Sequence, residues 1–403
     1  MGSIQISASG RYFVDASARP LFWLGDTQWE LFRLFEPPTA LRILDDRRRK
    51  GFNVILIMLL GVDTSRFGAT GQPPYMNCRG QTPWAEGNPL KPNEAYFEHI
   101  DEMVRLGERT GQTFVVGVYH QWQEKIITPA IARSWARWVA RRYRDVPNII
   151  WSMYPKATDA FVPVCRELAG GLREGDGGSH LICVHPDPAV ASSSFIHGED
   201  WLAFNMIQTC TKYEQIHETV AADYGRTPVK PVVMAEGGYE GVEFSKTQTA
   251  YEIRQQAYWT QLAGGHHVYG HNDAWSKPMD WEQWLDSPGT TSLRVFREIV
   301  TSCEAWWDLV PDQSLFIEGV GSGNQLNVAA RSGLGRWVLV YLSRPCTVSI
   351  SLDAITASDQ VNGWWLDPAN GNREPAGTWA ARGRPSFKTP ADRTDALLFL
   401  EAR

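Results

Sequence analysis

Short apolar segments alternate with amphipathic segments along most of the chain. The apolar segments are hydrophobic almost throughout and end at polar or glycine residues, which is typical of strands buried on both faces of a parallel sheet. A short hairpin is expected over Ile4–Val14. Eight buried strands are then predicted, at Leu21–Gly25, Val54–Leu60, Thr113–Tyr119, Ile149–Met153, Leu181–His185, Phe204–Gln208, Val232–Glu236 and His267–Gly270.

The segments between these strands carry apolar residues at helical spacing. In Pro92–Arg109, Phe97 and Ile100 share one face with further apolar residues, and charged residues point away from it. Pro129–Arg144 and Thr247–Leu262 have the same character, and Pro129 suits a first helical position. Eight buried strands separated by helices predict a closed (β/α)8 TIM barrel, because the count of eight favours closure over an open doubly wound sheet.

The pattern changes after the run Trp306-Trp307-Asp308-Leu309-Val310-Pro311. From Asp312 onward, short apolar segments alternate with turns rich in Gly, Pro, Asn and Asp. The predicted strands are Asn327–Ala330, Trp337–Tyr341, Val348–Leu352, Val361–Leu366 and Ala396–Glu401. We therefore expect a barrel domain over residues 1–311 and a small all-β sandwich over residues 312–403, with Trp306 and Trp307 packed between them.

Composition and charge narrow the class of protein. Apolar residues make up 43% and charged residues 21% of the chain, as in ordinary globular domains. The net charge of −6 comes from mixed acidic and basic residues, so no basic face is offered to nucleic acid. The chain has no signal-like start and no apolar stretch of the roughly 18 residues that a membrane span needs. We predict a cytoplasmic protein, or a secreted one if a signal was removed; no pattern specifies an oligomeric state.

Cysteine spacing gives no sign of a metal site or a disulfide framework. The six cysteines form no C-x-x-C pair, and several lie in apolar runs, so buried free thiols are expected. His266 and His267 are neighbours on a predicted strand and would face opposite sides, so they cannot share one metal. Metalloprotease, α/β-hydrolase and nucleotide-binding motifs are absent from the sequence. We therefore expect no metal and no cofactor.

Polar and aromatic residues follow directly after the predicted strands. Because the C-terminal ends of the strands carry the working residues of a parallel barrel, these side chains should meet in one pocket. They are Asp26, Trp29, His120, Trp122, Lys156, Asp159, His185, Gln208, Glu236, Tyr239, His271, Asn272 and Trp275. Hydrogen-bonding groups together with indole and phenol rings suit a carbohydrate, and the near absence of Lys and Arg argues against a phosphate.

Roles follow from the side-chain types. Asp26, His120, His185, Gln208, His271 and Asn272 would contact sugar hydroxyls, whereas Trp29, Trp122, Tyr239 and Trp275 would stack on sugar rings. Glu236 ends an apolar strand and precedes two glycines, which let a ligand approach closely. It is the candidate nucleophile, and the alternative is a buried ion-pair partner. Glu240 on the following loop is expected to be solvated.

Several longer motifs carry a family resemblance that spans essentially the whole chain. They are Gly10-Arg-Tyr-Phe-Val-Asp15, Phe22-Trp-Leu-Gly-Asp26-Thr-Gln-Trp29, Asn148-Ile-Ile-Trp151, Leu172-Arg-Glu-Gly-Asp-Gly-Gly-Ser-His180, Trp201-Leu-Ala-Phe-Asn-Met-Ile-Gln208, Ala235-Glu-Gly-Gly-Tyr-Glu240 and Tyr269-Gly-His-Asn272. Together they resemble the apiosidase-like glycoside hydrolases, glycoside hydrolase family 140 and its relatives. The resemblance implies a barrel with an acid after strand four and a nucleophile after strand seven, followed by a β domain of the collagen-binding type.

One departure from that family concerns the catalytic acid. Relatives read Trp-Ile-Leu-Gly-Gly-Asp at the end of strand four, whereas this chain reads Trp151-Ser-Met-Tyr-Pro-Lys156. Glycoside hydrolysis requires one carboxyl group to protonate the leaving oxygen and another to attack or to activate water. The candidate proton donors are Asp159, His120 and Lys156. Asp159 is the preferred carboxylate, although it also fits the start of a helix over Ala160–Leu172.

Three functions follow from these residues. The first is a glycoside hydrolase of the retaining type, with Glu236 as nucleophile, acting on a short glycan such as a furanoside. The second is a carbohydrate-binding protein that has lost catalysis because Lys156 replaces the acid. The third uses Lys156 as a Schiff-base nucleophile in an aldolase-like reaction. In each case the partner is a carbohydrate or a related small molecule, and neither nucleic acid nor a membrane is expected.

Overall fold

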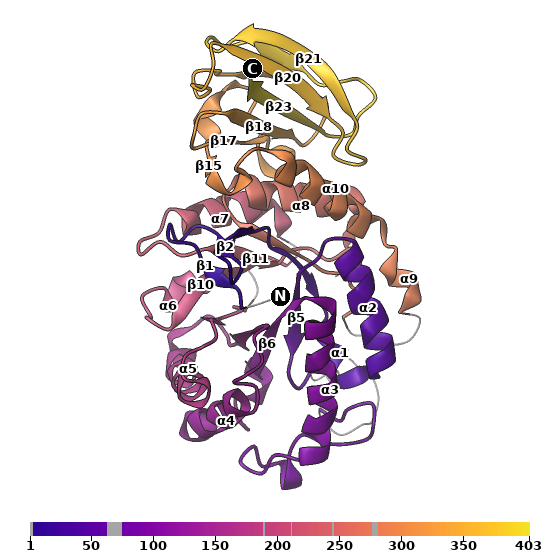
Figure 1. Ribbon diagram of the computed structural model, residues 1–403, viewed down its shortest axis with the longest axis vertical. Coiled ribbons are helices and arrows are strands. Elements are labelled where there is room, and N and C mark those ends of the chain that lie inside the picture. The colour runs from indigo at the N-terminus through magenta and orange to yellow at the C-terminus, as the bar shows by residue number, and fades with distance from the viewer. Residues whose placement is uncertain (1–2, 63–74, 188–189, 211, 244–245, 276–280) are drawn as a thin grey trace.

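Eight parallel strands close into a barrel in the computed structural model, which describes residues 3–62, 75–187, 190–210, 212–243, 246–275 and 281–403 (Figure 1). In barrel order the strands are β4 (Leu24–Thr27), β5 (Val54–Met58), β6 (Thr113–His120), β7 (Ile149–Tyr154), β8 (Ile182–Cys183), β10 (Leu202–Gln208), β11 (Val232–Glu236) and β14 (His266–Tyr269). β14 pairs with β4, and the pairing of β10 with β11 completes the ring. The predicted (β/α)8 barrel is confirmed, and each predicted strand overlaps an observed one.

The first barrel strand begins three residues later than the sequence pattern predicts. Pro20–Leu21 forms β3 of a separate antiparallel sheet with β1 (Gln5–Ile6) and β2 (Phe13–Val14). The barrel strand β4 then runs through Asp26 to Thr27. Asp26 was expected to follow the strand and to point into the pocket. It lies inside the strand instead, where side chains alternate between the two faces.

Helices surround the barrel and largely follow the predicted periodicity (Figure 1). They are α1 (Leu31–Leu34), α2 (Pro37–Arg49), α3 (Glu94–Thr110), α4 (Pro129–Arg142), α5 (Val162–Asp176), α6 (Ser193–Ile196), α7 (Ile216–Tyr224), α8 (Ala250–Leu262), α9 (Glu282–Leu285) and α10 (Pro288–Ser302). α4 and α5 approach closely, because a Cβ at Gly171 or Gly175 would meet the backbone oxygens of Arg133 or Arg137. The absence of side chains at Gly171 and Gly175 thus allows the two helices to pack closely.

The N-terminal sheet closes one end of the barrel. Phe13 of β2 is fully buried, with its ring centroid 4.6 Å from that of Trp23 and 5.2 Å from that of Phe204. His266 of β14 lies 5.0 Å away on the same side, while His267 faces helix α8, where its Nδ1 is 3.5 Å from Thr260 Oγ1. The two histidines therefore face opposite sides, as predicted.

The C-terminal part of the chain forms two packed antiparallel sheets. The larger has the order β15 (Leu309–Pro311), β17 (Val328–Ser332), β18 (Trp337–Leu342), β23 (Ala396–Ala402), β20 (Gln360–Leu366) and β21 (Arg373–Ala380). The smaller contains β16 (Phe316–Glu318), β19 (Thr347–Ile350) and β22 (Ser386–Lys388). The predicted sandwich is confirmed. β21 was missed because it is a mostly exposed edge strand without apolar alternation.

A continuous apolar core joins the two domains. One hydrophobic cluster contains Tyr258 of α8 and Phe296 of α10 together with Leu339 and Tyr341 of β18. The rings of Tyr258 and Tyr341 are stacked, with centroids 4.8 Å apart. Trp306 is buried in the same cluster, as predicted, whereas Trp307 is largely exposed. The two domains therefore share one apolar core across their junction.

A buried ion pair crosses the same interface. Arg254 of α8 donates to both carboxylate oxygens of Asp395, at 2.8 and 2.7 Å. The Tyr341 hydroxyl donates a third hydrogen bond to Asp395 at 2.8 Å. Both charged side chains are almost fully buried, and each is neutralised by a charge from the other domain.

The cysteines only partly follow the prediction. Cys165, Cys183 and Cys303 are buried, as predicted. Cys78 is exposed, and Cys210 and Cys346 are half-buried, so the expectation of buried thiols was wrong for these three. Among the described residues, no helix is long and apolar enough to cross a bilayer.

Removal of one member of the interdomain ion pair should destabilise the whole protein. Asp395→Ala leaves the Arg254 charge buried without its carboxylate, and we expect the free energy of unfolding to fall by about 3 kcal/mol. Urea unfolding measures this change. The control is Glu298→Ala, which removes an exposed helix pair with Arg294 and should change stability by less than about 0.5 kcal/mol. Equal effects of the two substitutions would contradict the assignment.

Candidate active site

The closing pair of barrel strands brings Glu236 beside Gln208. The register along β10 and β11 pairs Ile207 with Met234 and then skips one residue, so that Gln208 pairs with Glu236. Met234 packs in the outer layer against the helices, and strict alternation would place Glu236 on that same face. The irregularity aligns Glu236 with Gln208 instead, at the C-terminal end of the barrel.

A chain of hydrogen bonds orients the Glu236 carboxylate. Gln208 Nε2 donates to Glu236 Oε1 at 2.6 Å, and the Tyr154 hydroxyl donates to Gln208 Oε1 at 2.6 Å. Burial, reinforced by the Glu236 charge, raises the pKa of Tyr154 well above its ordinary value. The phenol therefore stays protonated and fixes the amide so that its NH2 group faces the carboxylate. Tyr154 ends β7 and was not among the predicted pocket residues, which after this strand were the charged residues Lys156 and Asp159.

His185 lies on the other side of the Glu236 carboxylate. Its Nε2 is 3.6 Å from Glu236 Oε2, and its Nδ1 is 3.2 Å from the carbonyl oxygen of Pro186. Burial lowers the pKa of His185 to about 3, so the ring is neutral near pH 7. A neutral ring that donates from Nδ1 presents a lone pair at Nε2. Within the described residues this buried atom has no hydrogen-bond partner, and it can accept a ligand hydroxyl.

Aromatic side chains form a wall around these polar groups. Trp29 Nε1 donates to the Tyr239 hydroxyl at 3.1 Å, and the Trp29 ring stands edge-on to His185 at 5.3 Å. His120 packs on Tyr154 at 4.8 Å and on Trp122 at 4.6 Å. These residues come from the ends of β4, β6, β7, β8 and β11, so the predicted convergence of Trp29, His120, Trp122, His185, Gln208, Glu236 and Tyr239 agrees with the structure.

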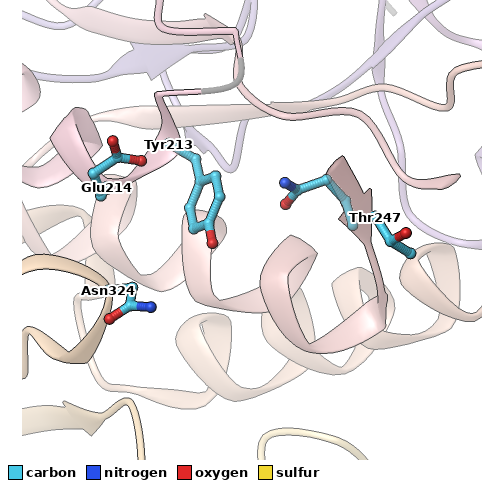
Figure 2. Close-up of a pocket in the computed structure, with 5 residues that line it drawn as sticks. Tyr213, Glu214, Thr247 and Asn324 are labelled. Atoms are coloured by element: carbon cyan, nitrogen blue, oxygen red, sulfur yellow. The ribbon is translucent and has the colours of Figure 1, made fainter. Parts of the chain in front are cut away.

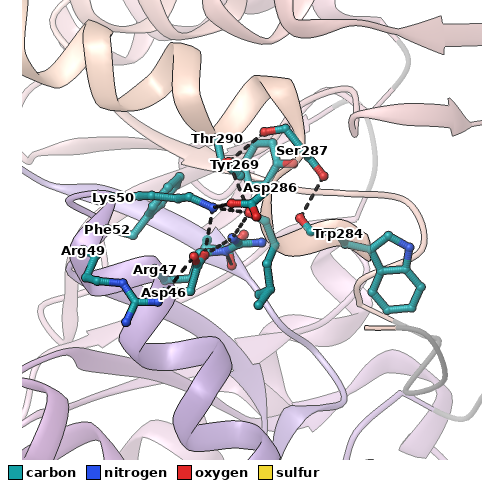
Figure 3. Close-up of polar contacts among 12 residues, drawn as sticks. Asp46, Arg47, Arg49, Lys50, Phe52, Tyr269, Trp284, Asp286, Ser287 and Thr290 are labelled. Carbon is teal, nitrogen blue, oxygen red and sulfur yellow. Dashed lines mark hydrogen bonds and ion pairs between the residues drawn. The ribbon is translucent and has the colours of Figure 1, made fainter. Parts of the chain in front are cut away.

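Asp26 lies outside this pocket. Its Oδ2 accepts hydrogen bonds from Arg47 Nε and Gln28 Nε2, both at 2.8 Å, and its side chain is fully buried. Arg47 also bonds Asp46, in the polar cluster that joins α2 to the segment before α10 (Figure 3). Asp26 therefore neutralises a buried arginine between β4 and α2, and the expectation that it contacts a sugar was wrong.

The residues after β14 lie at the rim. His271 and Asn272 are partly exposed, and Asp273 N donates to His271 Nδ1 at 3.2 Å. Trp275 is also partly exposed and packs against the cluster of residues that fills the barrel interior.

Glu240, which was expected to be solvated, is buried. It accepts hydrogen bonds from Tyr269 Oη at 2.6 Å and from Gly289 N at 2.8 Å, and burial raises its pKa.

The two predicted acid candidates after β7 lie in solvent. Lys156 and Asp159 are both exposed, and within the described part of the chain neither side chain forms a hydrogen bond or an ion pair. A different carboxylate lies closer to the pocket residues. Asp187 is only two residues beyond His185 and accepts a hydrogen bond from Gln121 Nε2 at 2.9 Å. Asp187 and Glu236 both contribute to the raised pKa of Tyr154.

A second hollow lies where the barrel meets the C-terminal domain. Figure 2 shows this cavity of about 470 Å³, which is lined by Tyr213, Glu214, Thr247, Gln248 and Asn324. Tyr213 follows Gln208 on the loop after β10, and Gln248 ends the hairpin of β12 (Gly241–Glu243) and β13 (Lys246–Gln248) that follows Glu236. The Gln248 side chain also packs beside Gly238. The hollow is therefore bounded by the same two loops that leave the pocket.

Comparison of the sequence with protein families gives two matches. The family described as "Apiosidase-like, catalytic domain" matches residues 7–308. The family described as "Putative collagen-binding domain of a collagenase" matches residues 310–401. No curated protein matches the chain.

Solved structures of low sequence identity share the fold. A glycoside hydrolase family 5 protein from Bacteroides vulgatus has a TM-score of 0.89 at 24% identity, covering 100% of this chain and 94% of its own. A family 27 β-L-arabinopyranosidase from Geobacillus stearothermophilus, solved with arabinose, has a TM-score of 0.59 at 10% identity over 95% of this chain and 97% of its own. A family 5 mannosidase from Rhizomucor miehei has a TM-score of 0.52 at 13% identity over 67% and 85%.

The neutral state of His185 should make the protein less stable in mild acid. Below a pH of about 6.5 the unfolded state binds a proton at this residue, whereas the native state does not until the pH approaches 3. The free energy of unfolding should therefore fall by about 1.4 kcal/mol for each pH unit below about 6 on account of this residue. Urea unfolding at several pH values measures this dependence. In His185→Asn the free energy of unfolding should fall less steeply with decreasing pH, by that amount.

His267→Asn provides the parallel test, because burial also lowers the pKa of His267 to about 3 and this residue lies outside the pocket. This substitution should reduce the pH dependence of the free energy of unfolding by the same amount. An unchanged slope in both variants would show that these imidazoles take up protons in the native state.

Proposed function

The chain belongs to the apiosidase-like family of glycosidases, and we propose that it hydrolyses a glycosidic bond of a small glycan with Glu236 as the nucleophile. The observation that carries this proposal is the orientation of one carboxylate by Gln208 and Tyr154, at the C-terminal end of the barrel, beneath a wall of aromatic rings. Enzymes of this barrel type carry their catalytic groups at this end.

The two carboxylate oxygens of Glu236 have different surroundings. Oε1 accepts the hydrogen bond from Gln208, and we assign the attack on the anomeric carbon to Oε2, on the side of His185. A sugar hydroxyl that donates to His185 Nε2 would place the ring next to Oε2. The bond from Oε2 to the anomeric carbon forms as the bond to the leaving oxygen breaks, and water later releases the sugar from Glu236.

For the proton donor we propose Asp187 in preference to Asp159. Two residues of extended chain span at most about 7 Å, so Asp187 lies near His185 and hence near Glu236. Asp187 is half-buried and held by Gln121, whereas Asp159 is exposed at the start of the helical segment before α5. In this role Asp187 gives its proton to the leaving oxygen and then removes one from the attacking water. A separation of about 5 to 5.5 Å between the two carboxyl groups would give retention of configuration.

The hollow at the domain junction favours a substrate of more than one sugar. Tyr213 offers a phenol face, and the other lining side chains offer carboxylate, hydroxyl and amide groups, which are the groups that bind sugar hydroxyls (Figure 2). An oligosaccharide whose terminal sugar enters the Glu236 pocket could extend its remaining units along the loops toward this hollow. The family resemblance adds furanosides such as apiosides to the substrates to be tried.

The surroundings of Lys156 bear on the two alternative functions, the aldolase-like reaction and carbohydrate binding without catalysis. Its exposed side chain lacks the burial that activates a Schiff-base lysine, so the aldolase-like reaction has no support from its surroundings. The replacement of the family acid by Lys156 does support a second candidate, a protein that binds glycans without cutting them. In that case the Glu236 pocket would bind sugars without turnover.

Replacement of the nucleophile tests the reaction. With aryl pyranosides and furanosides, including apiosides, Glu236→Gln should lower kcat by at least about 1000-fold while sugar binding persists. The control is Glu240→Gln, which changes another buried carboxylate four residues away and should keep most of the activity. Proton NMR of the first-formed anomer reports retention or inversion. Unimpaired turnover by Glu236→Gln would refute the assignment, and sugar binding without any turnover by the wild type would favour the second candidate.

Replacement of the proton donor depends on the leaving group. Because aryl leaving groups need little protonation, Asp187→Asn should slow the first step of an alkyl glycoside by about 100-fold or more and that of an activated aryl glycoside much less. Pre-steady-state kinetics on both substrates measures the difference. Asp159→Asn and Lys156→Ala are the matched controls and should affect both substrates little. A selective loss in Asp159→Asn instead would transfer the role to that residue.

A further inference from the structure

A group of three metal-binding side chain types lies at the edge of the barrel, away from the Glu236 pocket. Glu36 precedes helix α2, Cys78 lies on the segment before α3, and His99 belongs to α3. One potential ligand atom of each lies within 4.8 Å of the others. We propose that these three residues form a binding site for zinc or a similar thiophilic divalent cation.

The distances fit tetrahedral coordination. Cys78 Sγ is 3.4 Å from Glu36 Oε1 and 3.8 Å from His99 Nε2. A zinc ion with bonds of about 2.3 Å to sulfur and about 2.1 Å to nitrogen or oxygen separates its ligands by about 3.5 Å. An ion bound to these three atoms would therefore require only small movements of side chains, two of which are exposed at the surface. A water molecule would complete the tetrahedron.

The backbone around Cys78 is already fixed. Cys78 N donates to the carbonyl oxygen of Arg33 at 2.8 Å, and the buried Asn77 side chain accepts hydrogen bonds from the backbone of Arg79 and Gln81 at 3.0 and 2.9 Å. His99 is fully buried on α3. Two of the three ligands thus come from positions that fold without the ion, which lowers the entropy lost on binding.

The neighbouring charges also suit a cation. Arg79 pairs with Glu36 Oε2 at 3.1 Å and with Glu102 at 2.9 Å, so this hydrogen-bonded group carries one net negative charge while the Cys78 thiol is protonated. Binding of a divalent ion with loss of the thiol proton to solvent would bring the group to neutrality. Because Arg79 contacts Oε2, it leaves Oε1 directed at Cys78 and would orient the ligand carboxylate from outside.

The position of Glu36 is not explained by helix capping. It is the N-cap residue of α2, but its side chain forms no capping hydrogen bond with the helix. Its carboxylate faces Cys78 and Arg79 instead. An ion here would link the start of α2, the segment before α3 and α3 itself, so it would stabilise this side of the barrel independently of the Glu236 chemistry.

Cobalt titration of the whole, reduced and metal-stripped chain tests the site. Co²⁺ should produce a thiolate-to-metal absorption band in the near ultraviolet with one ion per chain, and Zn²⁺ should displace it. Cys78→Ala should abolish the band, and Glu36→Gln, which keeps the shape of the side chain, should weaken binding at least tenfold. Cys346→Ala removes another partly exposed thiol and should change nothing.

Thermal unfolding gives a second readout. Zn²⁺ should raise the Tm of the wild type and of Cys346→Ala but not that of Cys78→Ala. Absence of the cobalt band in the wild type, or an equal band in Cys78→Ala, would overturn the proposal. In that case the three residues form only a hydrogen-bonded group in which the thiol donates to Glu36.

Discussion

Closure of the eight-stranded sheet between β10 and β11 is the constraint on which the pocket depends. Parallel strands that form a ring bury both of their faces, so their side chains are apolar except at the ends. The closing pair ends in a register irregularity that aligns Gln208 with Glu236. The same contact that completes the barrel therefore sets the distance and direction of the hydrogen bond on the Glu236 carboxylate.

The polar groups of the pocket are held in place by a chain of successive hydrogen bonds. Tyr154 fixes Gln208, and Gln208 fixes Glu236, while His185 is kept neutral by burial. Gln208 holds one carboxylate oxygen of Glu236, and the other oxygen faces Nε2 of His185. This arrangement can bind a ligand that has both a hydroxyl donor and an electrophilic carbon. The indole and phenol rings beside this carboxylate suit the apolar faces of a sugar.

The C-terminal domain is built onto the barrel as a continuation of its core. Tyr258 and Tyr341 stack across the junction, and Arg254 and Asp395 neutralise each other there. Because each of these buried charges is neutralised by a charge from the other domain, separation of the two domains would leave both charges uncompensated. The hollow lined by Tyr213 and Asn324 lies at this junction.

The residues of the proposed metal site are close together in the structure but far apart in the sequence. Cys78, His99 and Glu36 are separated by more than twenty residues along the chain, and no short motif connects them. The cysteine count alone predicted buried thiols. Only the packing of α2 and α3 on the same side of the barrel brings a thiol, an imidazole and a carboxylate within reach of one ion.

The sequence by itself determined the barrel, the sandwich, the position of each barrel strand to within a few residues and the place of Glu236 at the end of its strand. These features follow from hydrophobic periodicity, which acts locally and is written directly in the order of residues. Tertiary structure alone decided which strand-end residues face the pocket. Asp26 lies within β4 and pairs with Arg47, the register irregularity between β10 and β11 aligns Glu236 with Gln208, and Asp187 on the loop after β8 bonds Gln121. Such outcomes depend on register and on contacts between distant segments, which no local pattern encodes.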